Sequence, residues 1–352
     1  MESSKTLMCF SLVDTDHDTV IPEYKESVTS NSNTMVRWGE DNLYPNLLRT
    51  LVKESVSATS VVNGTAEYMK SLKYEFNLSG NITADKANRD DESLLDIIDA
   101  CVKDQIVFGA FAIQVIYNKL GQIAEIWNVP VEFLRINESR DKFYFSKKWS
   151  KYSSKNIEYP KFGSSDDIVP SEIFMQTNAG RTQVYPISNF TSVLYDMYSE
   201  ATSGKYIAKT LDSGLASRFI ISLPNSQNLT DEMKAEIEEG IRNKFCGVNN
   251  AGSAMLYFNA GDAGLEVEKI DNDDSSDIFN TISDAASLRI YKAMHCTPNI
   301  MGDPSHSTGF NEQEYDGALK LFKRMTLVPL ARIIERGFNT VLGKNSVKII
   351  VE

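Results

Sequence analysis

The sequence is poor in the residues that build disulfides, metal centres and nucleophilic active sites. It has only 4 cysteines and 3 histidines among its 352 residues. The cysteines are far apart and form no CxxC pair, which in a reducing compartment indicates free thiols: Cys9, Cys101, Cys246 and Cys296. His295 and Cys296 are adjacent, but local residues do not complete the four ligands that structural zinc needs. We therefore expect no disulfide, no metal site and no cofactor.

Motifs of nucleotide chemistry and hydrolysis are absent too. The chain contains no GxxxxGK[ST] phosphate loop, no GxGxxG, no GxSxG and no HExxH. The alternating acidic segment 271–277 resembles a calcium-binding loop, but Ser276 stands where that loop needs glycine and Ile282 where it needs glutamate. We therefore predict that the protein is not an enzyme, and that any motor acting with it is another chain.

Long apolar runs and an excess of positive charge are also missing. No stretch approaches about 18 consecutive apolar residues, and the N-terminus offers no secretory signal, so we expect neither membrane insertion nor export. Acidic residues number 48 against 36 basic ones, which gives a net charge of -12. Such a surface repels the phosphates of DNA, which disfavours a protein that coats DNA tightly.

Helical and strand-like segments are mixed in the first half of the chain. Residues 1–37 combine short apolar runs with polar stretches, and we expect them to form a flexible arm. Apolar spacing then predicts three helices and a hairpin: helices over about 41–52, 61–72 and 92–108, and strands over 111–117 and 123–129. This half is therefore predicted to be mixed α and β.

Two long helices enclose a small lobe in the second half. Apolar residues recur at helical spacing over 189–213 and again over 276–295. Between them lie a helix that Thr230 can cap and three strand-like segments: 218–223, 254–258 and 265–270. A final helix begins after Asn311 and stops at Gly343, and Pro329 inside it predicts a kink.

The segment 142–162 interleaves lysines with aromatic residues: Tyr144, Trp149, Tyr152 and Tyr159. Such a composition can bind single-stranded nucleic acid by neutralising phosphates and stacking bases. A more ordinary interpretation is a set of amphipathic strands and loops whose lysines keep the surface soluble. The acid-rich chain around the segment favours the second interpretation.

A series of short motifs runs in order from Ile187 to Leu342. After a long helix come Leu223-Pro224, Leu229-Thr-Asp-Glu232, Gly247-Val-Asn-Asn-Ala-Gly252, Cys296-Thr-Pro-Asn-Ile-Met-Gly302, Gly309-Phe-Asn-Glu312, Thr326-Leu-Val-Pro-Leu330 and Ile333-Ile-Glu335. In this order the segments resemble the core of the tailed-bacteriophage portal protein family. The first half resembles the family more weakly, through residues 39–48 and 104–109.

The resemblance implies an α+β portal fold and a subunit of a ring, usually of twelve copies. The parts implied are a flexible arm 1–37, a wing 38–188, stem helices 189–213 and 274–296, a clip 214–273, a channel loop 297–311, and a long kinked helix 312–352 that returns to the wing. The chain ends at Glu352, so a crown is expected to be short or absent.

The resemblance also assigns functional residues. The loop 297–311 would face the DNA channel, and its lack of Lys and Arg suits a passage in which DNA slides, although it could simply connect two helices. Its prolines and glycines are expected to make it mobile. The expected channel residues are Thr297, Asn299, Met301, Ser305, His306, Ser307 and Thr308. The expected docking residues of the clip are Asn225, Gln227, Asn249, Asn250, Asn259 and Asp262.

The implied partners are further copies of the chain, the large terminase subunit, head-tail adaptor proteins, the major capsid protein or scaffold, and double-stranded DNA that passes without sequence specificity. The implied location is the portal vertex of the virion, after assembly in the host cytoplasm. Two other hypotheses stay open. One is a metal-dependent, nuclease-like enzyme with a carboxylate site, and the other is a smaller head-tail adaptor ring.

Overall fold

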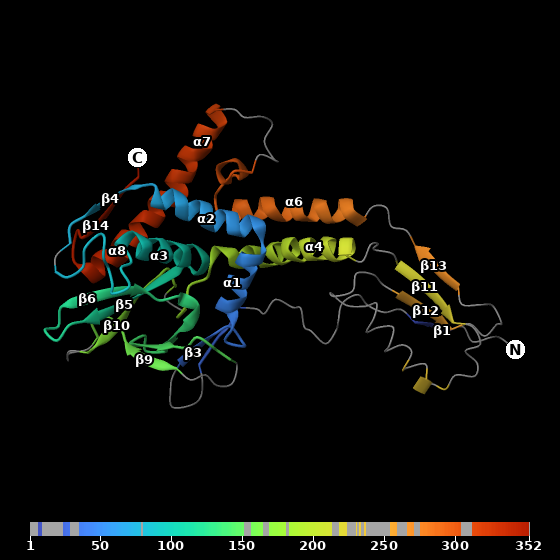
Figure 1. The fold of residues 1–352 in the computed structure, drawn as a ribbon, viewed down its shortest axis with the longest axis horizontal. Helices are drawn as coiled ribbons and strands as arrows, with labels where there is room; N and C mark the ends of the chain where they lie inside the picture. Colours follow the sequence, from blue (N-terminus) through green and yellow to red (C-terminus); the bar gives the residue numbers. More distant parts are fainter. Residues whose placement is uncertain are drawn as a thin grey trace. The chain divides into compact units, whose positions relative to one another are not determined.

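The computed structural model describes most of the chain: residues 6–8, 24–28, 35–78, 80–150, 156–164, 169–180, 183–212, 218–223, 230, 232–233, 236, 254–258, 266–270, 275–303 and 312–351. Helices and strands are mixed along it (Figure 1), which confirms the α+β prediction. The chain divides into two compact units. The main unit comprises Ile21–Tyr198 and Ala286–Glu352, and the insert unit comprises Met1–Val20 and Ser199–Ala285.

Three helices of the main unit follow the predicted apolar spacing: α1 Tyr44–Glu54, α2 Val56–Lys70 and α3 Leu94–Phe108. The break between α1 and α2 is a single residue, because Ser55 ends α1 and also caps α2 by accepting a hydrogen bond from the Ala58 N–H. α3 begins at a capping box on Ser93 and ends at Gly109, whose φ of 73° lies in the left-handed region that glycine tolerates.

The main unit contains a three-stranded antiparallel sheet with the order β10-β5-β6. The predicted hairpin is confirmed as β5 (Ala110–Tyr117) and β6 (Ile123–Asn128). On the other side of β5 lies β10 (Ser171–Thr177), which the sequence did not predict.

A second sheet has the order β2-β3-β7-β8-β9: β2 Glu26–Val28, β3 Met35–Trp38, β7 Leu134–Asn137, β8 Lys142–Phe145 and β9 Ile157–Pro160. A short 3-10 helix, η1 (Val131–Phe133), precedes β7. The prediction of a flexible arm is wrong for β2 and for the start of β3. The physical reason is long-range: the Glu26 carboxylate accepts hydrogen bonds from the Val184 and Tyr185 N–H groups, both at 2.9 Å.

The described aromatic side chains of the segment 142–162 pack within the protein. Tyr144 and Trp149 are buried. The Trp149 Nε1 donates to the Phe133 carbonyl at 3.0 Å, and the Arg135 guanidinium lies 4.8 Å from the centre of the Trp149 ring. Rings held in this way cannot stack on bases, so these residues fit the strand interpretation. Tyr152 lies outside the described residues.

The last helix is interrupted, as Pro329 predicts: it consists of α7 (Glu312–Phe322), a π-helical turn η5 (Lys323–Leu327) and α8 (Val328–Leu342). Pro329 has no N–H for the Met325 carbonyl, and its ring crowds the preceding turn. A wider π turn accommodates it, with the Val328 N–H reaching back to the Lys323 carbonyl.

The C-terminal segment closes onto the core of the main unit. Phe338 of α8 stacks on Phe111 of β5, with ring centres 6.0 Å apart. β14 (Val347–Ile350) then pairs antiparallel with β4 (Lys73–Phe76), the strand that follows α2. Residues from the two ends of the main unit therefore share one hydrophobic core.

The insert unit is built on a four-stranded sheet with the order β1-β12-β11-β13: β1 Thr6–Met8, β11 Arg218–Leu223, β12 Ala254–Phe258 and β13 Glu266–Ile270. The three predicted strands are confirmed, but β12 and β13 are not neighbours. β11 lies between them, parallel to β12 and antiparallel to β13. β1 is a further strand within the segment predicted to be an arm.

Two long helices connect the units along the chain. A 3-10 helix, η2 (Asn189–Val193), runs into α4 (Leu194–Asp212), and α6 (Ser275–Ala293) returns the chain to the main unit. Both helices were predicted from their apolar spacing. No helix among the described residues has both the length and the apolar character needed to cross a membrane.

Candidate functional site

The segment predicted to line the channel follows α6, and the helix end before it is fixed by backbone hydrogen bonds. The Cys296 N–H donates to the Tyr291 carbonyl at 3.1 Å, and the His295 N–H donates to the Lys292 carbonyl at 3.2 Å. These two bonds form a Schellman motif. His295 occupies its left-handed position, with a φ of 54°, where glycine is the usual residue.

The same kind of ending recurs at the short 3-10 helix η4 (Pro298–Met301). The Asp303 N–H donates to the Pro298 carbonyl at 3.0 Å, and the Gly302 N–H donates to the Asn299 carbonyl at 3.3 Å. Gly302 has a φ of 81°. Two residues in the left-handed conformation, His295 and Gly302, therefore set the path of the chain from α6 to Asp303.

The helix η4 is anchored on α2. Ile300 is buried, and Met301 lies against Gly64 of α2, where an added Cβ would come within 2.6 Å of the Met301 Sδ. The Ser60 hydroxyl also donates to the Met301 carbonyl at 3.4 Å. The absence of a side chain at Gly64 is what allows this close approach.

The predicted channel residues thus fall into two groups. Thr297, Asn299 and Met301 belong to the anchored turn and are half-buried. Residues 297–303 do have apolar anchors, because Ile300 and Met301 pack on the core, and the mobility expected of the loop 297–311 stays a prediction. The remaining four lie outside the described residues: Ser305, His306, Ser307 and Thr308.

The α2 residues that hold this turn were not predicted from the sequence. Ser60 and Gly64 lie one helical turn apart on α2, and small residues on one helix face are the signal that a neighbouring segment approaches closely. The docking residues predicted for the clip cannot be placed in this way, because all of them lie outside the described residues: Asn225, Gln227, Asn249, Asn250, Asn259 and Asp262.

A partly buried ion-pair network connects α1, α3 and η1. Arg49 donates to Asp104 and to Glu132, both at 2.6 Å, and its guanidinium lies 4.8 Å from the centre of the Phe108 ring. Burial raises the pKa of Asp104 to about 6, an effect that the neighbouring Arg49 partly offsets. Because all of these partners are internal, we interpret the network as a cross-link between three elements.

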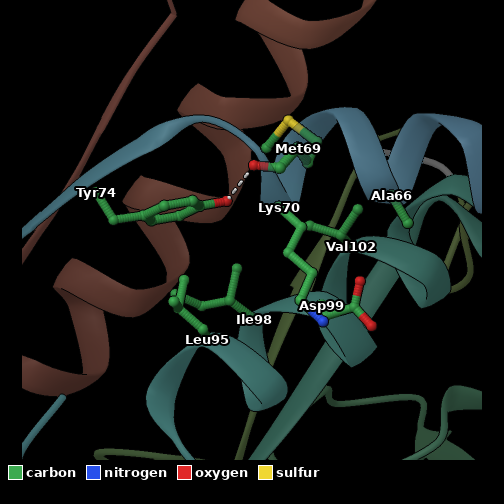
Figure 2. A pocket seen from close by; sticks show the side chains of 8 residues that line it. All are labelled: Ala66, Met69, Lys70, Tyr74, Leu95, Ile98, Asp99 and Val102. Atoms are coloured by element: carbon green, nitrogen blue, oxygen red, sulfur yellow. Dashed lines mark hydrogen bonds between the residues drawn. The ribbon is translucent and has the colours of Figure 1, made fainter. Parts of the chain in front are cut away.

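The described residues contain neither a metal cluster nor a reactive thiol. No group of three or more His, Cys, Asp or Glu side chains within the described part of the chain could hold a metal ion. Burial raises the pKa of the Cys101 and Cys296 thiols, to about 12 for Cys296, so neither is a thiolate at neutral pH. A depression between α2 and α3 (Figure 2) has no room for a water-sized ligand.

Comparison with known proteins places the chain in a family. A family model described as "Phage portal protein" matches residues 73–351. The chain belongs to the phage portal protein family. This confirms the resemblance found in the sequence motifs. No curated protein sequence matches this portal-family chain.

Solved structures of portal proteins and particle necks have a similar fold. The neck of a native GTA particle, computed with C12 symmetry, gives a TM-score of 0.56 at 15% identity and covers 87% of this chain and 84% of that chain. An HK97 family phage portal protein from Corynebacterium diphtheriae gives 0.53 at 10% identity and covers 86% and 94%. The virion of a native gene transfer agent particle gives 0.55 at 16% identity, with 88% and 85% covered. At these identities the likeness establishes a shared fold.

Proposed function

We propose that the chain is one subunit of a closed ring at a single capsid vertex of a tailed phage, through which DNA enters during packaging and leaves during ejection. Membership in the portal family carries the proposal. A similar fold in a particle neck computed with C12 symmetry supports a ring of about twelve copies. Each subunit then presents two different, complementary faces, because one rotation repeated about an axis closes the ring. In this role the ring forms the channel for DNA, and a separate motor protein drives the DNA through it.

The division of the chain supports the assignment of portal parts. α4 and α6 lead into and out of a compact insert, and Asp196 of α4 pairs with Arg289 of α6 at 2.9 Å within the main unit. We assign stem helices to 189–213 and 274–296, the clip to 214–273, the wing to 38–188, the channel segment to 297–311 and the returning helix to 312–352. β2 and β3 extend the proposed wing toward residue 24.

Native mass spectrometry and negative-stain imaging of the purified full chain test the ring directly. We expect a closed ring with a central hole and a mass of about twelve chains. A protein that stays monomeric at high concentration would overturn the proposal and favour the enzyme hypothesis. A clearly smaller ring would favour a head-tail adaptor.

The proposed clip is expected to dock the large terminase subunit during packaging and adaptor proteins afterwards. Replacing residues 215–270 by a short linker removes most of the insert unit and leaves the main core intact. We expect this variant to keep the near-ultraviolet circular dichroism of the main unit and to lose terminase binding in a pull-down. If this variant still bound the terminase, the docking surface would lie outside residues 215–270. The capsid protein or scaffold would contact other parts of the ring at the virion vertex, after assembly in the host cytoplasm.

The proposed channel segment can be tested by adding charge. Lysines at Ser305 and Ser307 would place positive charge around the DNA, and each phosphate contact should strengthen DNA retention and steepen its salt dependence. A matched control puts lysines at Thr50 and Ser139, two exposed positions of the main unit. We expect packaging or retention to change only in the first variant, with ring assembly normal in both. Equal behaviour at low and physiological salt would show that residues 297–311 do not face the DNA.

A further inference from the structure

The edge strands of the sheets in the main unit differ in whether their outward N–H and C=O groups already have hydrogen-bond partners. An edge strand presents N–H and C=O groups with which another chain can pair, and proteins usually close such edges. At β10, the Ile173 carbonyl accepts a hydrogen bond from the Phe162 N–H at 2.9 Å. At β9, Pro160 has no N–H to offer. These two edges are therefore poor templates for a further strand.

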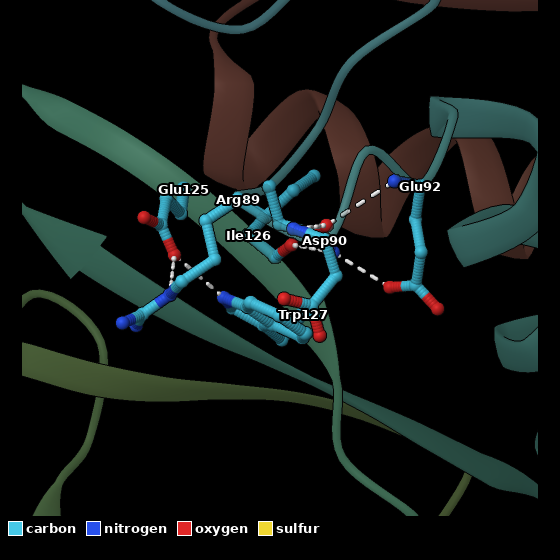
Figure 3. Close-up of polar contacts among 7 residues, drawn as sticks. Arg89, Asp90, Glu92, Glu125, Ile126 and Trp127 are labelled. Carbon is cyan, nitrogen blue, oxygen red and sulfur yellow. Dashed lines mark hydrogen bonds and ion pairs between the residues drawn. The ribbon is translucent and has the colours of Figure 1, made fainter.

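The edge of β6 is closed by a loop that precedes α3. The Ile126 N–H donates to the Ala87 carbonyl at 3.1 Å. Figure 3 shows how the loop is held beside the strand: Arg89 pairs with Glu125 at 3.2 Å, and the Trp127 indole N–H donates to the same carboxylate at 3.0 Å. Both edge strands of the three-stranded sheet, β10 and β6, are thus hydrogen-bonded to neighbouring segments of the chain.

The ribbon formed by β4 and β14 is closed on the β14 side. The Val347 N–H donates to the Asn339 side chain at 2.8 Å, and the Ile349 N–H donates to the Glu335 carboxylate at 2.5 Å. Both acceptors lie on α8. In an antiparallel pair, alternate residues direct their N–H and C=O groups to the partner strand and the residues between them direct theirs outward. Val347 and Ile349 are therefore the outward residues of β14.

The ribbon is open on the β4 side. Phe76 and Tyr74 stand opposite Val347 and Ile349 in the register, so their N–H and C=O groups point away from β14. No hydrogen bond from the described part of the chain reaches these backbone groups. The two rings stack with centres 5.9 Å apart and are half-buried, so the side chains of Tyr74 and Phe76 pack inward while their backbone groups meet no described hydrogen-bond partner.

Exposed lysines gather on the β4–β14 ribbon in a chain whose net charge is -12. Lys73 on β4 and Lys344 in the turn before β14 are exposed. Lys348 on β14 pairs with Glu75 at 2.9 Å, with both side chains about half exposed or more. The hydrogen bond and charge of Lys348, together with the charge of Lys73, lower the pKa of the Glu75 carboxyl, so positive charge dominates this face of the ribbon and a negatively charged occupant is favoured.

We propose that the outer edge of β4 binds an extended acidic segment of a partner protein, which adds to β4 as a further strand. Backbone pairing supplies affinity, and the lysines select acidic side chains. Within the part of the chain that the structure describes, acidic runs are held in a helix or a turn: Glu312–Asp316 in α7 and Asp90–Glu92 before α3. We therefore commit to another protein as the partner and treat a second copy as an outcome of the test. The inference goes beyond the proposed function, which assigns no partner to this edge.

Peptide probes test the proposal on the assembled full-length protein. The first is a ten-residue peptide that alternates glutamate with valine, and the second has lysine in place of glutamate. A third keeps the glutamates but has proline in place of valine, so it cannot pair as a strand. We expect only the first to bind in fluorescence anisotropy, and we expect it to slow hydrogen exchange at the Tyr74 and Phe76 amides. Binding of the proline peptide with equal affinity would show charge attraction without strand addition and would overturn the proposal.

Charge-reversal variants locate the binding. K73E/K344E should weaken binding of the acidic peptide by roughly tenfold or more, whereas K119E/K147E, which makes the same change at exposed positions elsewhere, should leave it within about twofold. Equal losses in both variants, or binding without protection of residues 73–76, would overturn the proposal. Protection of the same amides by a peptide copied from residues 312–321, at equal or tighter affinity, would make the occupant a second copy and also overturn it.

Discussion

Gly337 of α8 lies directly against the ring of Phe111 in β5. A Cβ at position 337 would overlap the Phe111 Cζ, and it would lie 3.0 Å from the Phe111 Cε2 and 3.3 Å from the Phe174 Cε1. Glycine inside a helix costs about 1 kcal/mol relative to alanine, so its presence here has a packing reason. The missing side chain lets the C-terminal helix approach the central strand of the three-stranded sheet.

Replacing this glycine should therefore destabilise the protein. We expect Gly337→Ala to lower the free energy of unfolding by about 1–3 kcal/mol, because overpacking outweighs the gain in helix propensity. Gly317→Ala in α7, where an added Cβ meets nothing within 4 Å, should instead raise it by up to about 1 kcal/mol. Urea unfolding of both variants measures the difference. Equal stability of the two variants would contradict the packing argument.

The π turn before α8 should depend on Pro329. Pro329→Ala restores an N–H for the Met325 carbonyl, so we expect a regular α-helix through 323–327 and a free energy of unfolding higher by about 1–3 kcal/mol. Pro45→Ala is the control, because Pro45 stands in the first turn of α1, where an N–H has no helical acceptor. Thermal unfolding and a structure of the variant test this. A π turn that persists in Pro329→Ala would assign its cause to the surrounding packing.

Stability should vary with pH through Asp104. Burial raises the pKa of this carboxyl from 3.8 to about 6. The folded protein therefore binds more protons here than the unfolded chain between about pH 4 and pH 6, so this contribution to stability is present at low pH and is lost as pH rises to about 6. Asp104→Asn removes the titration. The difference in unfolding free energy between the two proteins should change by on the order of 1–3 kcal/mol across that window, and parallel profiles would refute the assignment.

Two substitutions of His295, the residue with a positive φ at the end of α6, should change the free energy of unfolding in opposite directions. His295→Gly removes the cost of a positive φ and should raise the free energy of unfolding by up to about 1 kcal/mol. His295→Ile should lower it, because a β-branched side chain is unfavourable in this conformation. Lys292→Gly, in the last turn of α6, is the control and should lower it by about 1 kcal/mol. Denaturant unfolding distinguishes the three. A loss of stability in His295→Gly would mean that the imidazole makes a contact that outweighs the backbone cost.

Much of the local structure followed from the sequence because its causes are local. The helix α3 was predictable from apolar spacing between Ser93 and Gly109, since a cap and a left-handed stop act on neighbouring residues. The hairpin of β5 and β6, the long helix α4 and the interruption at Pro329 have causes of the same short range. The order of the motifs from Ile187 to Leu342 was enough to indicate the portal family, and the family model confirms it.

The strand partners and close contacts were decided only by the tertiary structure. β10 beside β5, β14 beside β4 and β1 beside β12 join residues far apart in sequence, and a strand's alternation does not state which strand it will meet. The same holds for the anchored turn at 297–303, whose Pro298 and Gly302 indicate a connection, although Gly64 and Ser60 of α2 hold it in place. Short-range patterns determined the long helices and the β5–β6 hairpin of this protein. Their partners, the open edge of β4 and the fixed path after α6 arose from packing between distant segments.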